Sequence, residues 1–224
     1  MAGCALSERP ATLRAMGTSE SLRPQDAEAA ARARILVAGG YLDPAEIAEA
    51  LVDEFSEPES ESDQEPESDE GAEFEYPRAV RITETIWRER FAEQADWPEI
   101  TESDAIEEAF EELEDRHIVA RADFTCCANC GHGEIQDELD EDSIGYVFFH
   151  NQSTDRAVAD GQLYLYYGAC EQQRAAEVGG LIVAELIAAG LPVKWSGDPG
   201  KAIVVGPIEW RRRIDAWELV YVAE

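Results

Sequence analysis

The feature that most limits the fold is an acidic segment at residues 56–77, SEPESESDQEPESDEGAEFEYP. It consists almost wholly of Glu, Ser, Asp and Pro, so it offers few side chains that a core can bury. Low hydrophobicity and repulsion between like charges predict disorder for such a segment. We therefore expect a disordered acidic linker here, with separate folded regions before and after it.

The region before the linker, residues 24–55, predicts a helical hairpin. Pro24 suits the first turn of a helix, and Gly39-Gly40 would end that helix. Asp43 can then cap a second helix, in which apolar residues recur every four positions up to Phe55. Two short helices joined by Gly-Gly-Tyr predict a helical hairpin.

The region after the linker, residues 78–213, predicts an α+β domain. Two amphipathic helices come first, over 78–94 and after Thr101, which has capping-box spacing to Asp104. Strand-like runs follow in HIVARADF, GYVFFHN, GQLYLYYG, LPVKW and KAIVV, with a helix in QQRAAEVGGLIVAELIAAG. We expect GYVFFHN and GQLYLYYG to form an antiparallel hairpin joined by a long loop.

The predicted fold class is therefore α+β. The N-terminal half is helical, and the C-terminal half holds a mostly antiparallel sheet of four to five strands with packed helices. The order of elements leaves no room for a doubly wound parallel sheet. Residues 1–23 lack periodicity and predict a flexible tail, while 214–224 predict a C-terminal tail or an edge strand.

The chain carries a formal net charge of −31, and there is no Lys or Arg between Ile35 and Pro77. Such a charge repels phosphate backbones and anionic lipid headgroups, so we expect no nucleic-acid and no membrane partner. A basic protein partner would be attracted. No apolar run is long enough to span a membrane and no signal peptide stands out, so we expect a cytoplasmic protein.

The sharpest chemical signal is the run Cys127-Ala-Asn-Cys130-Gly-His132, which has the form of half a zinc knuckle. Two cysteines separated by two residues can place both thiolates on one ion, and the glycine after the second permits the turn. The five cysteines form no paired framework of the secreted kind. The pattern therefore predicts a zinc site.

A structural zinc needs four ligands, and there is no second Cys-x-x-Cys motif. The remaining candidates, not all of which can bind at once, are Cys126, His132, His150 and Cys170. Cys126 adjoins Cys127, so its side chain can point the other way. His150 and Cys170 would lie toward opposite ends of the predicted hairpin, so at most one of them is expected to reach the knuckle.

Two alternatives to zinc stay open. Cys127 and Cys130 could form a redox pair, although such a motif favours a βαβ setting and a helix N-terminus that lowers the thiol pKa. The cysteines could also be buried and unliganded beside a turn. No set of nucleophile, acid and base stands out, so the sequence favours a protein that is not an enzyme.

The run ESDAIEEAFEELEDRHIVARADFTCCANCGHGEI, followed by GYVFFHNQSTD and LYLYYG, resembles a family of uncharacterised, mainly actinobacterial proteins defined by a domain of unknown function. The motifs are Cys-Cys-x-x-Cys-Gly-His at 126–132 and Tyr-Val-Phe-Phe-His at 146–150. The resemblance covers most of residues 24–213. It implies a bacterial cytosolic setting and no particular activity.

Together these features predict a non-enzymatic binding or regulatory domain stabilised by zinc. The two alternatives are a thiol redox protein that uses Cys127 and Cys130, and an acidic immunity-like or antitoxin-like partner of a basic protein.

Overall fold

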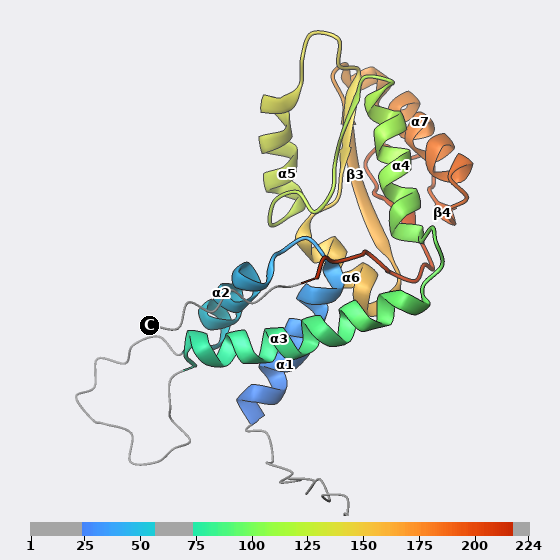
Figure 1. The fold of residues 1–224 in the computed structure, drawn as a ribbon. Coiled ribbons are helices and arrows are strands. Elements are labelled where there is room, and N and C mark those ends of the chain that lie inside the picture. The colour runs from blue at the N-terminus through green and yellow to red at the C-terminus, as the bar shows by residue number, and fades with distance from the viewer. Residues whose placement is uncertain (1–23, 57–73, 217–224) are drawn as a thin grey trace, which may run out of the picture.

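The computed structural model describes residues 24–56 and 74–216 (Figure 1). The expected tail over residues 1–23, linker residues 57–73 and residues 217–224 lie outside the described residues. The chain is α+β, with most helices in the N-terminal half and a five-stranded, mostly antiparallel sheet in the C-terminal half. The predicted fold class is therefore confirmed.

Three helices form the N-terminal layer: α1 (Pro24–Gly39), α2 (Pro44–Phe55) and α3 (Tyr76–Glu93). Asp43 caps α2 as expected, in a capping box that Glu46 completes. The predicted helical hairpin does not stand alone, because α1 and α2 share one buried cluster with α3. This cluster is rich in alanine, which lets the helices approach closely.

The end of the acidic segment differs from the prediction of disorder up to residue 77. Phe74 is only 1% exposed and packs in the three-helix cluster, and α3 already begins at Tyr76. The centroids of the Phe55 and Phe74 rings lie 5.7 Å apart, so the residue just before the acidic segment contacts one near its end. Burial of one aromatic ring outweighs the acidic composition of its neighbours.

The sheet contains β1 (Ile118–Arg121), β2 (Gly145–Phe148), β3 (Leu163–Ala169), β4 (Val193–Lys194) and β5 (Ile203–Val205). Its strand order is β1-β2-β3-β5-β4. The β1–β2 pair is parallel and the other three pairs are antiparallel. The parallel pair, which the sequence pattern does not reveal, requires a crossover between β1 and β2.

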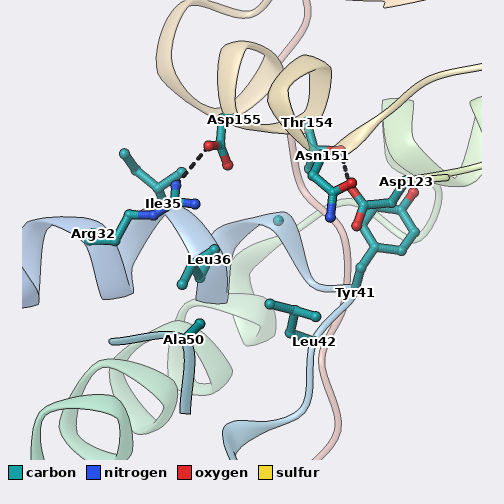
Figure 2. Close-up of a pocket in the computed structure, with 11 residues that line it drawn as sticks. Arg32, Ile35, Leu36, Tyr41, Leu42, Ala50, Asp123, Asn151, Thr154 and Asp155 are labelled. Atoms are coloured by element: carbon teal, nitrogen blue, oxygen red, sulfur yellow. Dashed lines mark hydrogen bonds and ion pairs between the residues drawn. The ribbon is translucent and has the colours of Figure 1, made fainter. Parts of the chain in front are cut away.

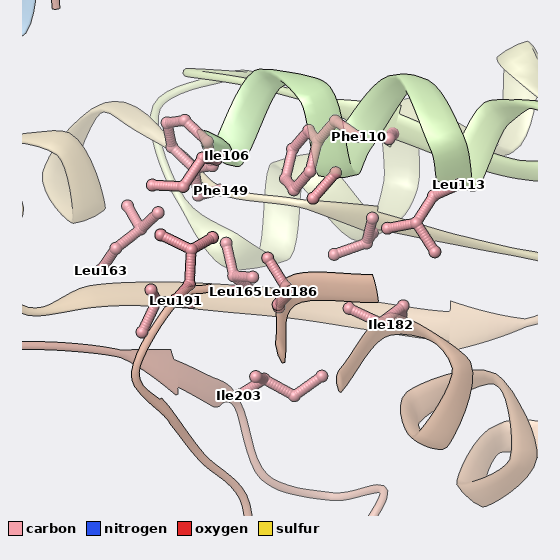
Figure 3. Close-up of a cluster of buried hydrophobic side chains, with 14 of the residues drawn as sticks. Ile106, Phe110, Leu113, Phe149, Leu163, Leu165, Ile182, Leu186, Leu191 and Ile203 are labelled. Carbon is pink, nitrogen blue, oxygen red and sulfur yellow. The ribbon is translucent and has the colours of Figure 1, made fainter. Parts of the chain in front are cut away.

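Two helices, α4 (Glu102–Glu114) and α7 (Ala175–Ala188), cover one face of the sheet (Figures 1 and 3). Phe110 and Leu113 of α4 meet Ile182 and Leu186 of α7 over the strands, as Figure 3 shows. Gly179 allows α7 to lie close to the sheet, since a Cβ there would stand 2.8 Å from both Trp195 and Tyr167.

The opposite face of the sheet is covered at β1 and β2 by α5 (Ala128–Glu134) and the 3₁₀ turn Ile135–Glu138. Alternate residues of β2 serve the two faces: Val147 packs under α4 and α7, while Tyr146 and Phe148 pack under α5.

The connection between β2 and β3 corrects the expectation of a long loop. These strands pair antiparallel as predicted, but helix α6 (Asn151–Asp160) joins them. The segment is polar, and the residues that α6 buries are Ser153, Thr154 and Ala157, so few large apolar side chains mark its buried face. Helix α6 packs between α1 and β3, and these contacts stabilise it.

The extended segment after β5 ties the two halves of the molecule together. The Trp210 indole donates to the Gly39 carbonyl at 3.3 Å, and Arg212 forms an ion pair with Glu107. Arg213 pairs with Asp104 and Arg211 pairs with Glu209, each at 2.6 Å, so the arginines of this segment form internal salt bridges. Described residues 214–216 form no strand. Over the described ranges, no helix has the length and apolar character needed to cross a membrane.

Candidate metal centre

The cysteine segment begins where β1 ends and leads directly into α5. The Phe124 amide donates to the Phe149 carbonyl at 2.8 Å, and the Asn151 amide donates to the Thr125 carbonyl at 3.3 Å. These bonds hold the segment against the end of β2. Asp123 and Thr125 have φ angles of 49° and 61°, a left-handed conformation that turns the chain sharply ahead of the cysteines.

Three thiols converge at this point. The Sγ atoms of Cys126, Cys127 and Cys130 all lie within 4.8 Å of one another, and those of Cys126 and Cys130 are 3.6 Å apart. Two sulfurs bound to one tetrahedral zinc at about 2.3 Å would stand roughly 3.8 Å apart. The cluster therefore has the donor atoms and nearly the spacing of a thiolate metal site.

Cys126 joins the cluster, although its side chain is expected from the sequence to point away from Cys127. The run is not an irregular knuckle: Cys127 is the N-cap of α5, and Cys130 lies in the first turn. Cys126 lies just before the N-cap, and the extended backbone at Cys127 leads the chain into α5 so that the Cys126 Sγ lies 3.6 Å from that of Cys130. Cys126 and Cys130 are exposed and Cys127 is half-buried, so the cysteines are not buried as one alternative proposed.

Gly131 places α5 tightly on the sheet. A Cβ at this position would overlap the Phe148 ring, so only glycine lets the helix approach β2 so closely. With Gly131 buried against the sheet, Cys126 and Cys130 remain at the surface.

The thiols also shift one another's acidity. Hydrogen bonds from the Cys130 amide and then from the Cys130 thiol lower the pKa of Cys127. The same thiol–thiol bond to Cys127, followed by that to Cys126, raises the pKa of Cys130 to about 11. The cluster thus favours one thiolate, which accepts hydrogen bonds from the neighbouring S–H groups. A divalent cation would stabilise further thiolates, because it would replace the protons of those S–H groups.

His132 does not join the cluster. It lies two residues after Cys130 in the helix, and its Nδ1 atom is 2.9 Å from the Tyr146 hydroxyl. Its ring meets that of Phe148 edge-on at 5.1 Å, and burial lowers its pKa. The imidazole therefore packs on the sheet, away from the three sulfurs.

His150 and Cys170 are also separate from the three thiols. His150 is 6% exposed, precedes α6 and stacks on Tyr166 at 5.1 Å. The Cys170 amide donates to the Ile144 carbonyl at 3.1 Å, at the other end of the β2–β3 pair. The two residues thus lie toward opposite ends of the paired strands, as the sequence argument anticipated.

The chain belongs to a family defined by a domain of unknown function, DUF6891, whose family model matches residues 23–214. No curated protein and no solved structure matches the chain.

Proposed function

We propose that this domain of unknown function is a non-enzymatic regulatory protein that binds zinc through Cys126, Cys127 and Cys130. The observation that carries the proposal is the convergence of three Sγ atoms within 4.8 Å. Thiolates are soft ligands and select zinc over the hard cations magnesium and calcium. Zinc would supply a Lewis-acidic centre with one coordination position left for another ligand.

The arrangement favours a site whose zinc can exchange over a structural zinc site that the fold depends on. All three cysteines lie within five consecutive residues, so a metal there joins no distant parts of the chain and closes only a short loop. The main hydrophobic core lies between the sheet, α4 and α7, away from these cysteines. Exposure of Cys126 and Cys130 also gives a fourth ligand direct access to the ion.

The test is elemental analysis of the full-length chain, purified without contact with an affinity metal and paired with a count of free thiols. We expect about one zinc per chain. The variants Cys126→Ser, Cys127→Ser and Cys130→Ser should lose the metal, while Cys170→Ser, an exposed cysteine outside the cluster, should keep it. Metal-free protein whose thiols remain free and unreactive would refute the proposal.

A second candidate, a thiol–disulfide oxidoreductase, is favoured by the connection between β1 and β2. These strands are parallel, and α5 lies between them with Cys127 at its N-cap, which is the setting that a redox Cys-x-x-Cys motif favours. Here the Cys127 thiolate would attack a substrate disulfide and release one substrate thiolate. Cys130 would then attack the mixed disulfide, leaving a Cys127–Cys130 bond and a reduced substrate.

The redox candidate predicts a metal-free protein in which two thiols disappear on oxidation and return on reduction. Mass spectrometry of oxidised protein, digested without reductant, would identify a peptide that has lost two hydrogens between Cys127 and Cys130. A bound zinc that protects these thiols from oxidation would support the metal site instead.

The charge of the protein supports a basic protein as partner for either activity. Exposed Glu108, Glu111 and Glu112 give α4 an acidic outer surface. We propose an intracellular setting as well, because reducing conditions keep exposed thiols free to bind metal. Capture of a basic partner that is lost between low and high salt would support this part of the proposal.

A further inference from the structure

A pocket of about 210 Å³ lies between the helical layer and α6 (Figure 2). Its lining comes from α1, α2, the turn between them, the segment after β1, and α6. Pockets for drug-sized ligands measure roughly 300–1,000 Å³, so this one suits a smaller molecule. None of the thiols of the metal centre lines it.

The pocket has one polar and one apolar side, as Figure 2 shows. Asp123, Asn151 and Thr154 form the polar side. Leu36 of α1 and Leu42 of the following turn lie opposite them. A ligand with a polar head and a short hydrocarbon tail would satisfy both sides, whereas a bare ion would leave the apolar side without a partner.

Asp123 gives the polar side an unbalanced charge. Its Oδ1 atom accepts a hydrogen bond from the Thr154 hydroxyl at 2.5 Å. No Lys or Arg within residues 24–56 and 74–216 forms an ion pair with this carboxylate. Burial raises the pKa of Asp123, and the nearby Asp155 raises it further. A bound cation would relieve this unfavourable charge.

The basic side chain that lines the pocket is already engaged. Arg32 pairs with Asp155 at 2.7 Å and with Glu54 at 3.2 Å. It therefore neutralises a carboxylate from the same pocket and leaves Asp123 uncompensated. The lining as a whole repels anions and attracts cations.

The tyrosine of the pocket is held rigidly. Arg212 lies over the Tyr41 ring at 4.1 Å, and the rings of Phe149 and Trp210 stand 6.0 and 6.4 Å away. Burial raises the pKa of Tyr41 to about 12, so its hydroxyl stays protonated and uncharged at neutral pH. Arg212 also donates a hydrogen bond to this hydroxyl, so Tyr41 forms a fixed, neutral part of the pocket wall.

We propose that this pocket binds a small organic cation, with an ammonium head against Asp123 and a short apolar tail against Leu36 and Leu42. The inference is independent of the metal centre, because it uses none of the cysteines. Asp123 is the specificity-determining residue, since it supplies the charge that separates an amine from a neutral molecule of the same shape. The Asn151 side chain adds polar atoms at the same side of the pocket.

The test compares the binding of n-butylammonium and of n-butanol to the full-length protein. Two-dimensional amide NMR detects the binding of each compound. We expect saturable shifts of resonances from the residues that line the pocket, with a dissociation constant on the order of millimolar because so few atoms contribute. Butanol should bind roughly tenfold more weakly, since a hydrogen bond to a charged group exceeds a neutral one by about that factor. Equal binding of the two probes, or no saturable shift with butylammonium, would overturn the proposal.

Two variants assign the effect to the pocket. Asp123→Asn keeps the shape and suits the left-handed backbone at this position, so it should fold and lose the preference for the amine. Ala50→Leu adds volume from α2 and should weaken both probes alike. If Asp123→Asn still prefers butylammonium, the amine binds elsewhere. If the preference for butylammonium is lost in Ala50→Leu and kept in Asp123→Asn, the Asp123 carboxylate does not recognise the amine.

Discussion

The thiol cluster and the pocket are built in opposite ways. Cys126, Cys127 and Cys130 stand within five residues, on the surface, at the start of one short helix. The pocket joins residues as far apart as Arg32 and Asp155, at the meeting of the helical layer with the α+β layer. A local site depends on one segment and its support, whereas an assembled site depends on the packing of the whole molecule.

The segment over Asp123 to Thr125 lies between the two sites. Asp123 faces the pocket, and the cysteines begin directly after Thr125. The comparison therefore predicts that changes in the core will remove the pocket before the thiol site, and that changes in the cluster will spare the fold.

The largest expected effect comes from Phe149→Ala. Phe149 is fully buried and packs against Tyr41, Phe110 and Trp210, where the two layers meet. We expect a loss of about 3–5 kcal/mol in the free energy of unfolding, measured by urea denaturation. The control Phe91→Ala removes a ring that is 43% exposed and should change stability by less than about 0.5 kcal/mol. A similar small loss in both variants would show that the layers do not depend on this contact.

The next effect is on metal affinity. Removing one of three ligands in Cys130→Ser should lower zinc affinity on the order of a hundredfold, measured by competition with a chromogenic chelator. The midpoint of urea unfolding for the metal-free protein should stay close to that of the wild type, because Cys130 is exposed. Unfolding of the whole chain on chelation would contradict the local character of this site.

A pair of glycines in α5 tests how the helix is seated. In Gly131→Ala the new methyl group would overlap Phe148, and we expect a loss of about 1–3 kcal/mol in unfolding free energy. Gly133 has nothing within 4 Å of its Cβ direction, so Gly133→Ala should be neutral or raise stability by about 0.5–1 kcal/mol. Zinc affinity should fall only in Gly131→Ala. Equal changes in stability and zinc affinity in the two variants would mean that the contact with Phe148 does not position α5.

The smallest effect concerns the pH dependence of stability. Because the folded-state pKa of Asp123 is raised, its contribution to stability is fully present below the unfolded pKa of about 3.9 and is lost as the pH rises through the folded value. Asp123→Asn removes this loss, so it should raise the unfolding free energy at pH 7 by roughly 0.5 kcal/mol. Urea denaturation at pH 7 and near pH 4 checks this, and a variant that is less stable than wild type at pH 7 would contradict it.

Local patterns predicted much of the fold. The cap at Asp43, the capping box at Thr101 and the amphipathic helix that follows it lie where the sequence placed them, because capping and amphipathic periodicity involve residues within one or two turns. The sequence of α6 is polar and its buried residues are small or polar, so the pattern predicts a loop where the structure has a helix. The acidic neighbours of Phe74 predict that it belongs to the linker, although its burial depends on helices far away in the sequence.

The sequence by itself determined the α+β class and the Cys127–Cys130 pair, since composition, periodicity and close spacing are properties of single segments. Only the tertiary structure decided that Cys126 turns into the cluster, while His132 packs on Tyr146. It alone also decided that Asp123 faces Leu36 across a pocket. The physical reason is that a side chain's direction and partners are fixed by the elements packed around it, and the linear order of residues does not contain that information.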